Sequence, residues 1–121
     1  MKSKITSLSK NNDFKSILGG NKISNKYITI FFKKLSDKDY KKLNISFVAK
    51  KKIGNAVKRN KIKRRLRNIM NDANKKLNLN FKYCYLLIAK SLIIKSQYED
   101  IKETLFTDFT KIKWIKLLNN Y

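Results

Sequence analysis

The sequence predicts an α+β fold whose elements follow in the order helix, strands, helix, strand, helix. Apolar residues alternate with a period of two in 27–33 and 43–50, and recur at steps of three and four in 12–18 and 59–77. The 121 residues, 42% of them hydrophobic, suffice for one buried core. We therefore expect a single domain over 1–121, frayed over its first eight or so residues and its last few.

The first helix is expected at 12–18. Phe14, Ile17 and Leu18 are spaced i, i+3, i+4, which places them on one helical face. The pair Gly19 and Gly20 follows directly and is a typical helix stop.

Two strands are expected next. In 27–33, alternation assigns one set to the core, namely Ile28, Ile30 and Phe32, and a second set to a less apolar face, namely Tyr27, Thr29 and Phe31. The stretch 43–50 alternates again through Ile45, Phe47 and Ala49. The polar connection at 35–42 indicates that the two strands pair in an antiparallel manner.

A second helix is expected over 59–77, because apolar residues recur there at helical steps: Ile62, Leu66, Ile69, Met70, Ala73 and Leu77. A buried strand follows at Tyr83 to Lys90. Ser96 and Glu99 match a capping box, so a last helix should start near Gln97. Its expected core stripe is Ile101, Leu105, Phe109 and Ile112.

The charge balance predicts a polyanionic partner. The net charge is +22 and the pI is about 10.2, which is typical of a protein that binds nucleic acid or an anionic surface. No apolar run is long enough to span a bilayer or to act as a signal peptide, so we expect a cytoplasmic protein without a membrane partner. With no histidine and a lone cysteine, Cys84, in an apolar strand, neither imidazole catalysis nor a zinc site of the Cys/His type is expected.

All four arginines fall within 59–67, whereas every other cation is a lysine. A guanidinium presents a planar fork of donors that matches phosphate geometry, which an ammonium does not. Opposite the apolar stripe of this helix, a cationic ridge is expected to contain Asn60, Lys61, Lys63, Arg64 and Arg67. A solvated helix face would also explain the pattern, but no carboxylate follows until Asp72, so the cations repel one another unless an external anion is present.

Aromatic residues near the first helix and first strand suggest a second contact surface. Unpaired bases stack on aromatic rings, and nearby cations hold their phosphates. Phe14, Tyr27 and Phe31 are the candidates. Periodicity alone leaves open whether they line a groove or belong to the core.

The residues 53–67, IGNAVKRNKIKRRLR, resemble the signature of the bacterial ribonuclease P protein component. The core of that signature is matched by Arg59-Asn60-Lys61-Ile62-Lys63-Arg64, with Ala56 and Arg67 also in place. The resemblance extends over most of the chain, through Asp13-Phe14 on the first helix and Ile88-Ala89-Lys90 on the later strand. It implies an α/β sandwich with a sheet of about four strands and a left-handed β-α-β crossover, contrary to the usual right-handed rule.

The resemblance also implies a function. In this family a small protein joins a catalytic RNA, and together they remove the 5′ leader from precursor tRNA. The RNA carries out hydrolysis with Mg²⁺, and the protein contributes no catalytic residue, no metal site and no small-molecule site. Contacts with the catalytic RNA are implied for Arg59, Asn60, Lys61, Lys63, Arg64 and Arg67, with auxiliary contacts from Lys50, Lys51 and Lys52.

A leader-binding cleft is implied at Phe14, Ile30, Phe31 and Lys90. Two positions depart from the family pattern: Leu18 stands where a second aromatic is common, and Lys90 stands where arginine is common. Two other functions compete with this one. A ribosomal or general RNA-binding protein explains the charge but not the signature, and a free-standing protein nuclease requires clustered carboxylates that the sequence disperses.

Overall fold

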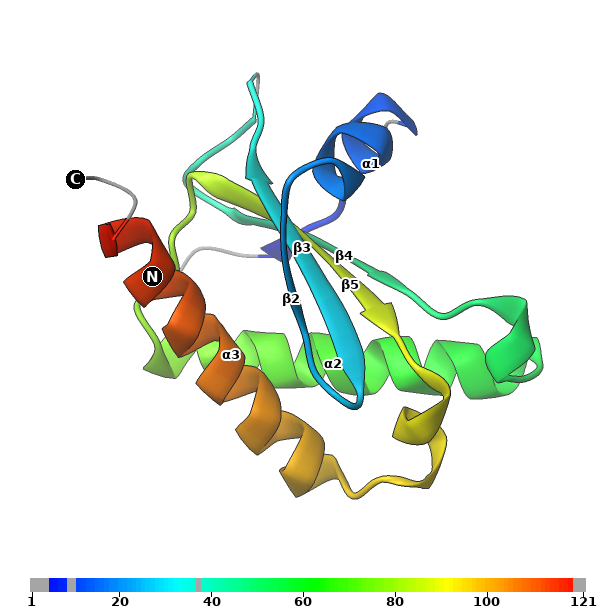
Figure 1. Cartoon of the computed structure of the whole chain (residues 1–121). Coiled ribbons are helices and arrows are strands. Elements are labelled where there is room, and N and C mark those ends of the chain that lie inside the picture. The colour runs from blue at the N-terminus through cyan, green and yellow to red at the C-terminus, as the bar shows by residue number, and fades with distance from the viewer. Residues whose placement is uncertain (1–4, 9–10, 37, 119–121) are drawn as a thin grey trace.

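The computed structural model describes residues 5–8, 11–36 and 38–118 (Figure 1). Its helices are α1 (Asn11–Leu18), α2 (Ala56–Lys76) and α3 (Tyr98–Leu118), with short 3-10 helices η1 (Lys51–Ile53) and η2 (Ser91–Lys95). Its strands are β1 (Ile5–Thr6), β2 (Asn21–Ser24), β3 (Ile28–Lys34), β4 (Leu43–Val48) and β5 (Tyr83–Ala89). The predicted α+β class is confirmed.

The strands form one mixed sheet in the order β1-β4-β5-β3-β2. Strand β5 pairs antiparallel with β3, with Phe31 opposite Leu86, and parallel with β4, with Phe47 opposite Leu87. The expected direct pairing of the segments 27–33 and 43–50 is therefore wrong. The later strand lies between them because it is the most continuously apolar of the three, and a central strand is covered on both faces.

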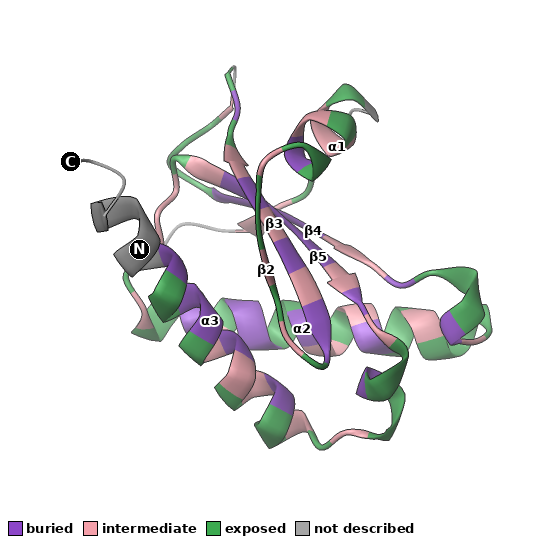
Figure 2. Ribbon diagram, viewed as in Figure 1, coloured by how far each residue is buried: buried purple, intermediate pink, exposed green. Residues whose placement is uncertain are grey.

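The two faces of the sheet are covered unequally. Helices α2 and α3 cover one face, where the first core cluster joins Ile30 and Phe32 of β3 to Ile62 and Leu66 of α2. On the other face, α1 packs on β3 and β5 through a second cluster that contains Leu8, Ile17, Leu35, Cys84 and Leu86. Figure 2 shows buried residues along α2, α3 and the central strands. The apolar stripes predicted for α2 and α3 are confirmed as core, except that Leu77 is half-buried and follows the last residue of α2.

The amino-terminal segment differs from the frayed end that we expected. Ile5 and Thr6 pair in parallel with Leu43 and Asn44. The backbone N–H of Leu8 donates to the hydroxyl of the buried Ser46 at 2.8 Å. These bonds hold 5–8 against β4, while the expected fraying at the carboxyl end concerns residues outside the described ranges.

Strand β2 and the end of η2 were also not anticipated. β2 is short and mostly polar, so it lacks the alternation that reveals a strand, and the Gly20 turn places it beside β3. A Cβ on Gly20 would lie 2.8 Å from the Phe32 carbonyl oxygen, so only glycine fits this turn. Helix α3 begins at Tyr98, so Ser96 lies one residue before the cap position, and its hydroxyl donates to the Leu92 carbonyl at 2.8 Å.

The turn between β2 and β3 is locked by Asn25. Its side-chain oxygen accepts bonds from the N–H groups of Tyr27 at 2.8 Å and Ile28 at 2.9 Å. Its amide nitrogen donates to Asp108 of α3 at 2.6 Å, and Asp108 is buried. One side chain therefore fixes the hairpin to itself and to α3.

Candidate nucleic-acid interface

The amino-terminal end of α2 is fixed by two side-chain hydrogen bonds. Asn55 is its N-cap, with the side-chain oxygen accepting the N–H of Lys58 at 3.0 Å. This cap explains why the helix begins at Ala56, earlier than the apolar repeat indicated. Arg59 Nε donates to the Gly54 carbonyl at 3.2 Å and so also braces the turn.

The predicted ridge residues all lie on α2, and the structure separates them by direction. Asn60 and Arg64 are exposed along the crest. Arg67 is exposed on the flank above β4, where its guanidinium lies over the ring of Phe47, 5.5 Å from the centroid. Arg59 and Lys63 are half-buried. With no acidic residue in the first four turns of α2, this surface is continuous in its positive charge.

Lys50, Lys51 and Lys52 extend the positive surface beyond the helix. All three are exposed, and they lie at and within η1, directly before the turn at Gly54 that leads into α2. The next residue, Ile53, is buried in the first core cluster. That anchor holds the three ammonium groups close to the amino-terminal end of α2, where the helix dipole adds to their field.

Two cations on the opposite flank of α2 were missed in the sequence. Lys58 and Arg65 line a hollow together with Lys61, Ile62 and the η2 residues Ile93 and Ile94. Their spacing of i, i+3 and i+7 with Lys61 indicates a common helix face. What the sequence did not indicate is that η2 would supply the other wall, since a 3-10 segment has no recognisable period.

The second candidate surface lies on the face that carries α1. Phe14 and Phe31 are half-buried and pack on the second cluster together with the half-buried Val48 and Ile88. An ion pair, Lys38 Nζ to Asp13 at 2.6 Å, anchors α1 to the loop that follows β3. Phe14 and Phe31 are thus partly core and partly accessible. The sequence left open whether they line a groove or belong to the core, and each has something of both.

The structure corrects the assignment of Ile30 to this surface. Ile30 is 0% exposed and belongs to the first cluster, on the face covered by α2 and α3. It alternates with Phe31, so the two side chains lie on opposite faces of β3. Tyr27, which precedes β3, is likewise buried in the first cluster rather than on the α1 face.

Lys90 has a structural partner that the sequence did not reveal. Its ammonium donates to the Ser24 hydroxyl and to the Asn25 carbonyl, each at 2.6 Å. Its backbone N–H donates to the Tyr27 carbonyl at 2.8 Å. Lys90 therefore ties the end of β5 to the β2–β3 turn, and two of its three ammonium donors are already engaged.

Two titratable side chains of β5 are buried. Burial raises the pKa of the Cys84 thiol and of the Tyr85 hydroxyl, so both are neutral at physiological pH. Among these residues, no three acidic or thiol side chains are grouped so that they could hold a metal ion. None of the helices in the described ranges is both long and apolar enough to cross a bilayer.

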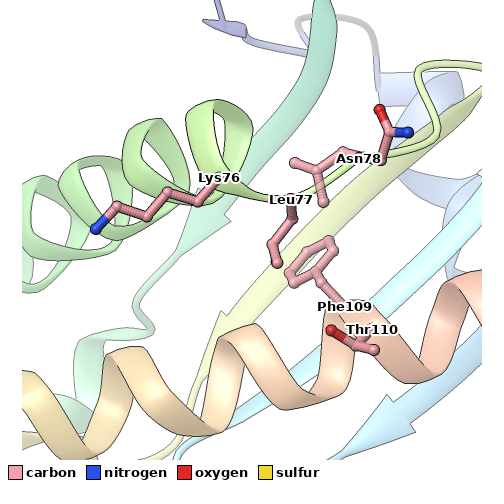
Figure 3. A pocket seen from close by; sticks show the side chains of 6 residues that line it. Lys76, Leu77, Asn78, Phe109 and Thr110 are labelled. Atoms are coloured by element: carbon pink, nitrogen blue, oxygen red, sulfur yellow. The ribbon is translucent and has the colours of Figure 1, made fainter.

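A further hollow, with a volume of about 330 Å³, lies between the carboxyl end of α2 and α3 (Figure 3). The ring of Phe109 points toward Leu77, whereas the side chain of Lys76 extends away. The hydroxyl of Thr110 is engaged with the Phe106 carbonyl at 2.9 Å. This hollow offers no set of converging polar groups, so the candidate interface remains the surface of α2 and the α1 face of the sheet.

Comparisons with known proteins identify relatives of this chain. The family model described as Ribonuclease P matches residues 2–113. The ribonuclease P protein component of Mycoplasma mycoides subsp. mycoides SC is 34% identical over 106 residues, which cover 88% of this chain and 94% of that protein.

Two solved structures share the fold. The ribonuclease P protein of Staphylococcus aureus superposes with a TM-score of 0.73 and 26% identity, covering 88% of this chain and 94% of that one. That of Thermotoga maritima gives a TM-score of 0.74 and 25% identity, covering 88% and 96%.

Proposed function

The chain belongs to the ribonuclease P protein family, and we propose that it presents α2 to the catalytic RNA of this ribonucleoprotein and the α1 face to the 5′ leader of precursor tRNA. Membership of the family makes it the protein component of the ribonucleoprotein that processes tRNA. The single observation that supports the division of labour is the geometry: the arginine-rich helix and the half-buried aromatic residues lie on opposite faces of one sheet.

The exposed crest and flank of α2 are the proposed contact with the catalytic RNA. Arginine forks at Arg59, Arg64 and Arg67 bind phosphates in pairs of hydrogen bonds, and Asn60 contacts a base or a ribose. Lys61 and Lys63 add to the field along the helix, and Lys50, Lys51 and Lys52 extend it past the Gly54 turn. A large part of the binding free energy should come from counterion release, which makes affinity fall steeply with salt.

The α1 face is the proposed site of the single-stranded leader. Phe14 and Phe31 offer ring surface on which unpaired bases stack, and Val48 and Ile88, which pack on the same cluster, add apolar surface. Lys90 has one ammonium donor left, so its contribution to leader phosphates is smaller than an arginine would make. Ile30 is excluded from this contact by its burial on the other face.

Hydrolysis is assigned to the RNA. The described residues offer neither an acid-base pair nor a carboxylate group that fits Mg²⁺, so we place the required Mg²⁺ at the RNA rather than on the protein. The protein forms a single RNA-binding domain and takes no small-molecule substrate. It works in the cytoplasm, where precursor tRNA is processed in bacteria.

Cleavage of a 5′-extended precursor tRNA by a bacterial catalytic RNA at low Mg²⁺, with and without the protein, tests this function. We expect stimulation that yields the mature 5′ end, and no cleavage by the protein alone. RNA binding without stimulation would favour a general RNA-binding protein. Cleavage by protein freed of all RNA would indicate a protein nuclease instead.

A further inference from the structure

A hollow of about 220 Å³ separates the first turns of α2 from η2, on the flank opposite Phe47. Its walls are of two kinds. Ile62 and Ile93 form a buried apolar floor, and Ile94, which is 41% exposed, forms the apolar edge. Lys58, Lys61 and Arg65 supply the other edge from successive turns of α2.

The chemistry of this hollow is that of a site for an anion with an apolar part. Within the described part of the chain, no carboxylate forms an ion pair with any of its three cations. A ligand that fits this hollow needs an apolar face that can cover Ile94 and an anionic group that can neutralise the cations. A nucleotide meets both requirements, because its flat base can lie on the isoleucines while its phosphate binds the cations.

The size of the hollow limits the ligand. Pockets that enclose whole drug-sized ligands have volumes of about 300–1,000 Å³. The smaller hollow here fits one base, whereas a stacked pair or a duplex edge would not enter it. The ligand is therefore a nucleotide that is unpaired and turned out of its helix, a type of feature that proteins read readily in folded RNA.

We propose that the hollow between α2 and η2 captures one unpaired nucleotide of the catalytic RNA, with its base on Ile93 and Ile94 and its phosphate on Lys58, Lys61 and Arg65. This inference rests on the proposed function. The catalytic RNA is the source because the hollow shares α2 with the arginine ridge, whereas the leader lies on the opposite face of the sheet. The nucleotide gives a fixed register to a ridge whose arginines and lysines otherwise contact only phosphates.

Ile94→Asp, with Leu92→Asp as its matched control, tests the proposal. Both residues are exposed apolar positions of η2, at 41% and 48%, but only Ile94 lines the hollow. Affinity for the catalytic RNA should fall about tenfold for Ile94→Asp and about twofold or less for Leu92→Asp. Ile94→Val should retain the wild-type affinity. Equal effects of the two aspartates, or no effect of either, would overturn the proposal.

Crosslinking identifies the ligand. Ile94→Cys and Leu92→Cys each provide an exposed thiol for a photoreactive probe. Since the native Cys84 is buried, the probe attaches to the introduced cysteine. We expect Cys at 94 to crosslink to one unpaired nucleotide of the catalytic RNA in the holoenzyme. A crosslink to the leader would overturn the choice of RNA. Loss of self-association in Ile94→Asp with unchanged RNA affinity would make the face an interface between copies.

Failure of the proposed function looks different from failure of this inference. If wild-type protein does not stimulate leader removal, the function itself is wrong. If wild-type protein stimulates it and Ile94→Asp does so with unchanged RNA affinity, only the nucleotide site is wrong.

Discussion

The guanidinium of Arg67 lies over the ring of Phe47, 5.5 Å from its centroid, and so connects α2 to the sheet below it. Phe47 is half-buried on β4 and packs against the first core cluster. An aromatic platform restricts the orientation of the guanidinium before any RNA arrives. Arg67 is thus both a surface cation and a part of the α2–β4 contact.

Phe47→Leu should weaken this contact and leave the fold intact. A double-mutant cycle with Arg67→Gln, measured by urea unfolding, should give a coupling free energy of about 0.5–1 kcal/mol. Phe47→Leu should also lower affinity for the catalytic RNA a few-fold, because Arg67 loses its preferred orientation. Additive effects of the two substitutions would show that the ring does not orient the arginine.

Arg64→Ala and Arg59→Ala should both weaken RNA binding, but they should differ in their effect on the free energy of unfolding. Each should reduce the salt slope of RNA binding by about one. Arg64 is exposed on the crest, so its loss should leave the free energy of unfolding unchanged, whereas loss of the bond from Arg59 to Gly54 should lower it by about 1 kcal/mol. Titration of RNA at several salt concentrations, with urea unfolding, checks both. An unchanged salt slope would remove the argument for phosphate contacts.

Phe14→Leu should separate the two roles of the ring on α1. Leucine keeps apolar contact with the second cluster, so the unfolding free energy should fall by less than about 1 kcal/mol, whereas Phe14→Ala should lower it by about 1–2 kcal/mol. Both should reduce holoenzyme affinity for leader-bearing tRNA relative to mature tRNA, because base stacking is lost. An unchanged affinity ratio in Phe14→Leu would make Phe14 purely structural.

Asn25→Ala should be among the most damaging single changes at a polar residue. It removes the two acceptor bonds that close the β2–β3 turn and leaves the buried Asp108 without its 2.6 Å donor. We expect the free energy of unfolding to fall by about 2–3 kcal/mol. Ser24→Ala removes only one bond from Lys90 and is the control. Similar small losses of unfolding free energy in both variants would show that Asn25 does not fix the β2–β3 turn.

Alkaline pH should destabilise the protein through Cys84. Burial raises the pKa of this thiol, against the opposing effect of Lys38, so the folded state holds its proton after the unfolded chain releases it above about pH 8.5. Stability is complete below that pH and is lost as pH rises. The stability of wild type relative to Cys84→Ala should fall as the pH rises from about 8 to about 10 in urea unfolding. A constant difference would contradict this.

The helices were predictable because their apolar repeats depend only on residues close in sequence. The ridge was predictable because it lies opposite the apolar repeat of α2. The pairing of strands was not, since nothing within 27–50 indicates that β5 enters between β3 and β4. The same limit applies to side chains that act at a distance along the chain. Lys90 matches the family pattern as a cation, but its bonds to Ser24 and Asn25 depend on tertiary contact. The hollow between α2 and η2 could not be predicted either, because it depends on the tertiary contact between these two helices.

The central position of β5 has a consequence for biosynthesis. Neither β3 nor β4 can complete its pairing until residue 89 has left the ribosome, and by then the whole of α2 has been made. During that interval the basic helix has no finished sheet to pack on, and the nascent chain exposes its cations and its apolar stripe together. Pulse proteolysis of stalled nascent chains should therefore detect protection only in chains that extend beyond β5.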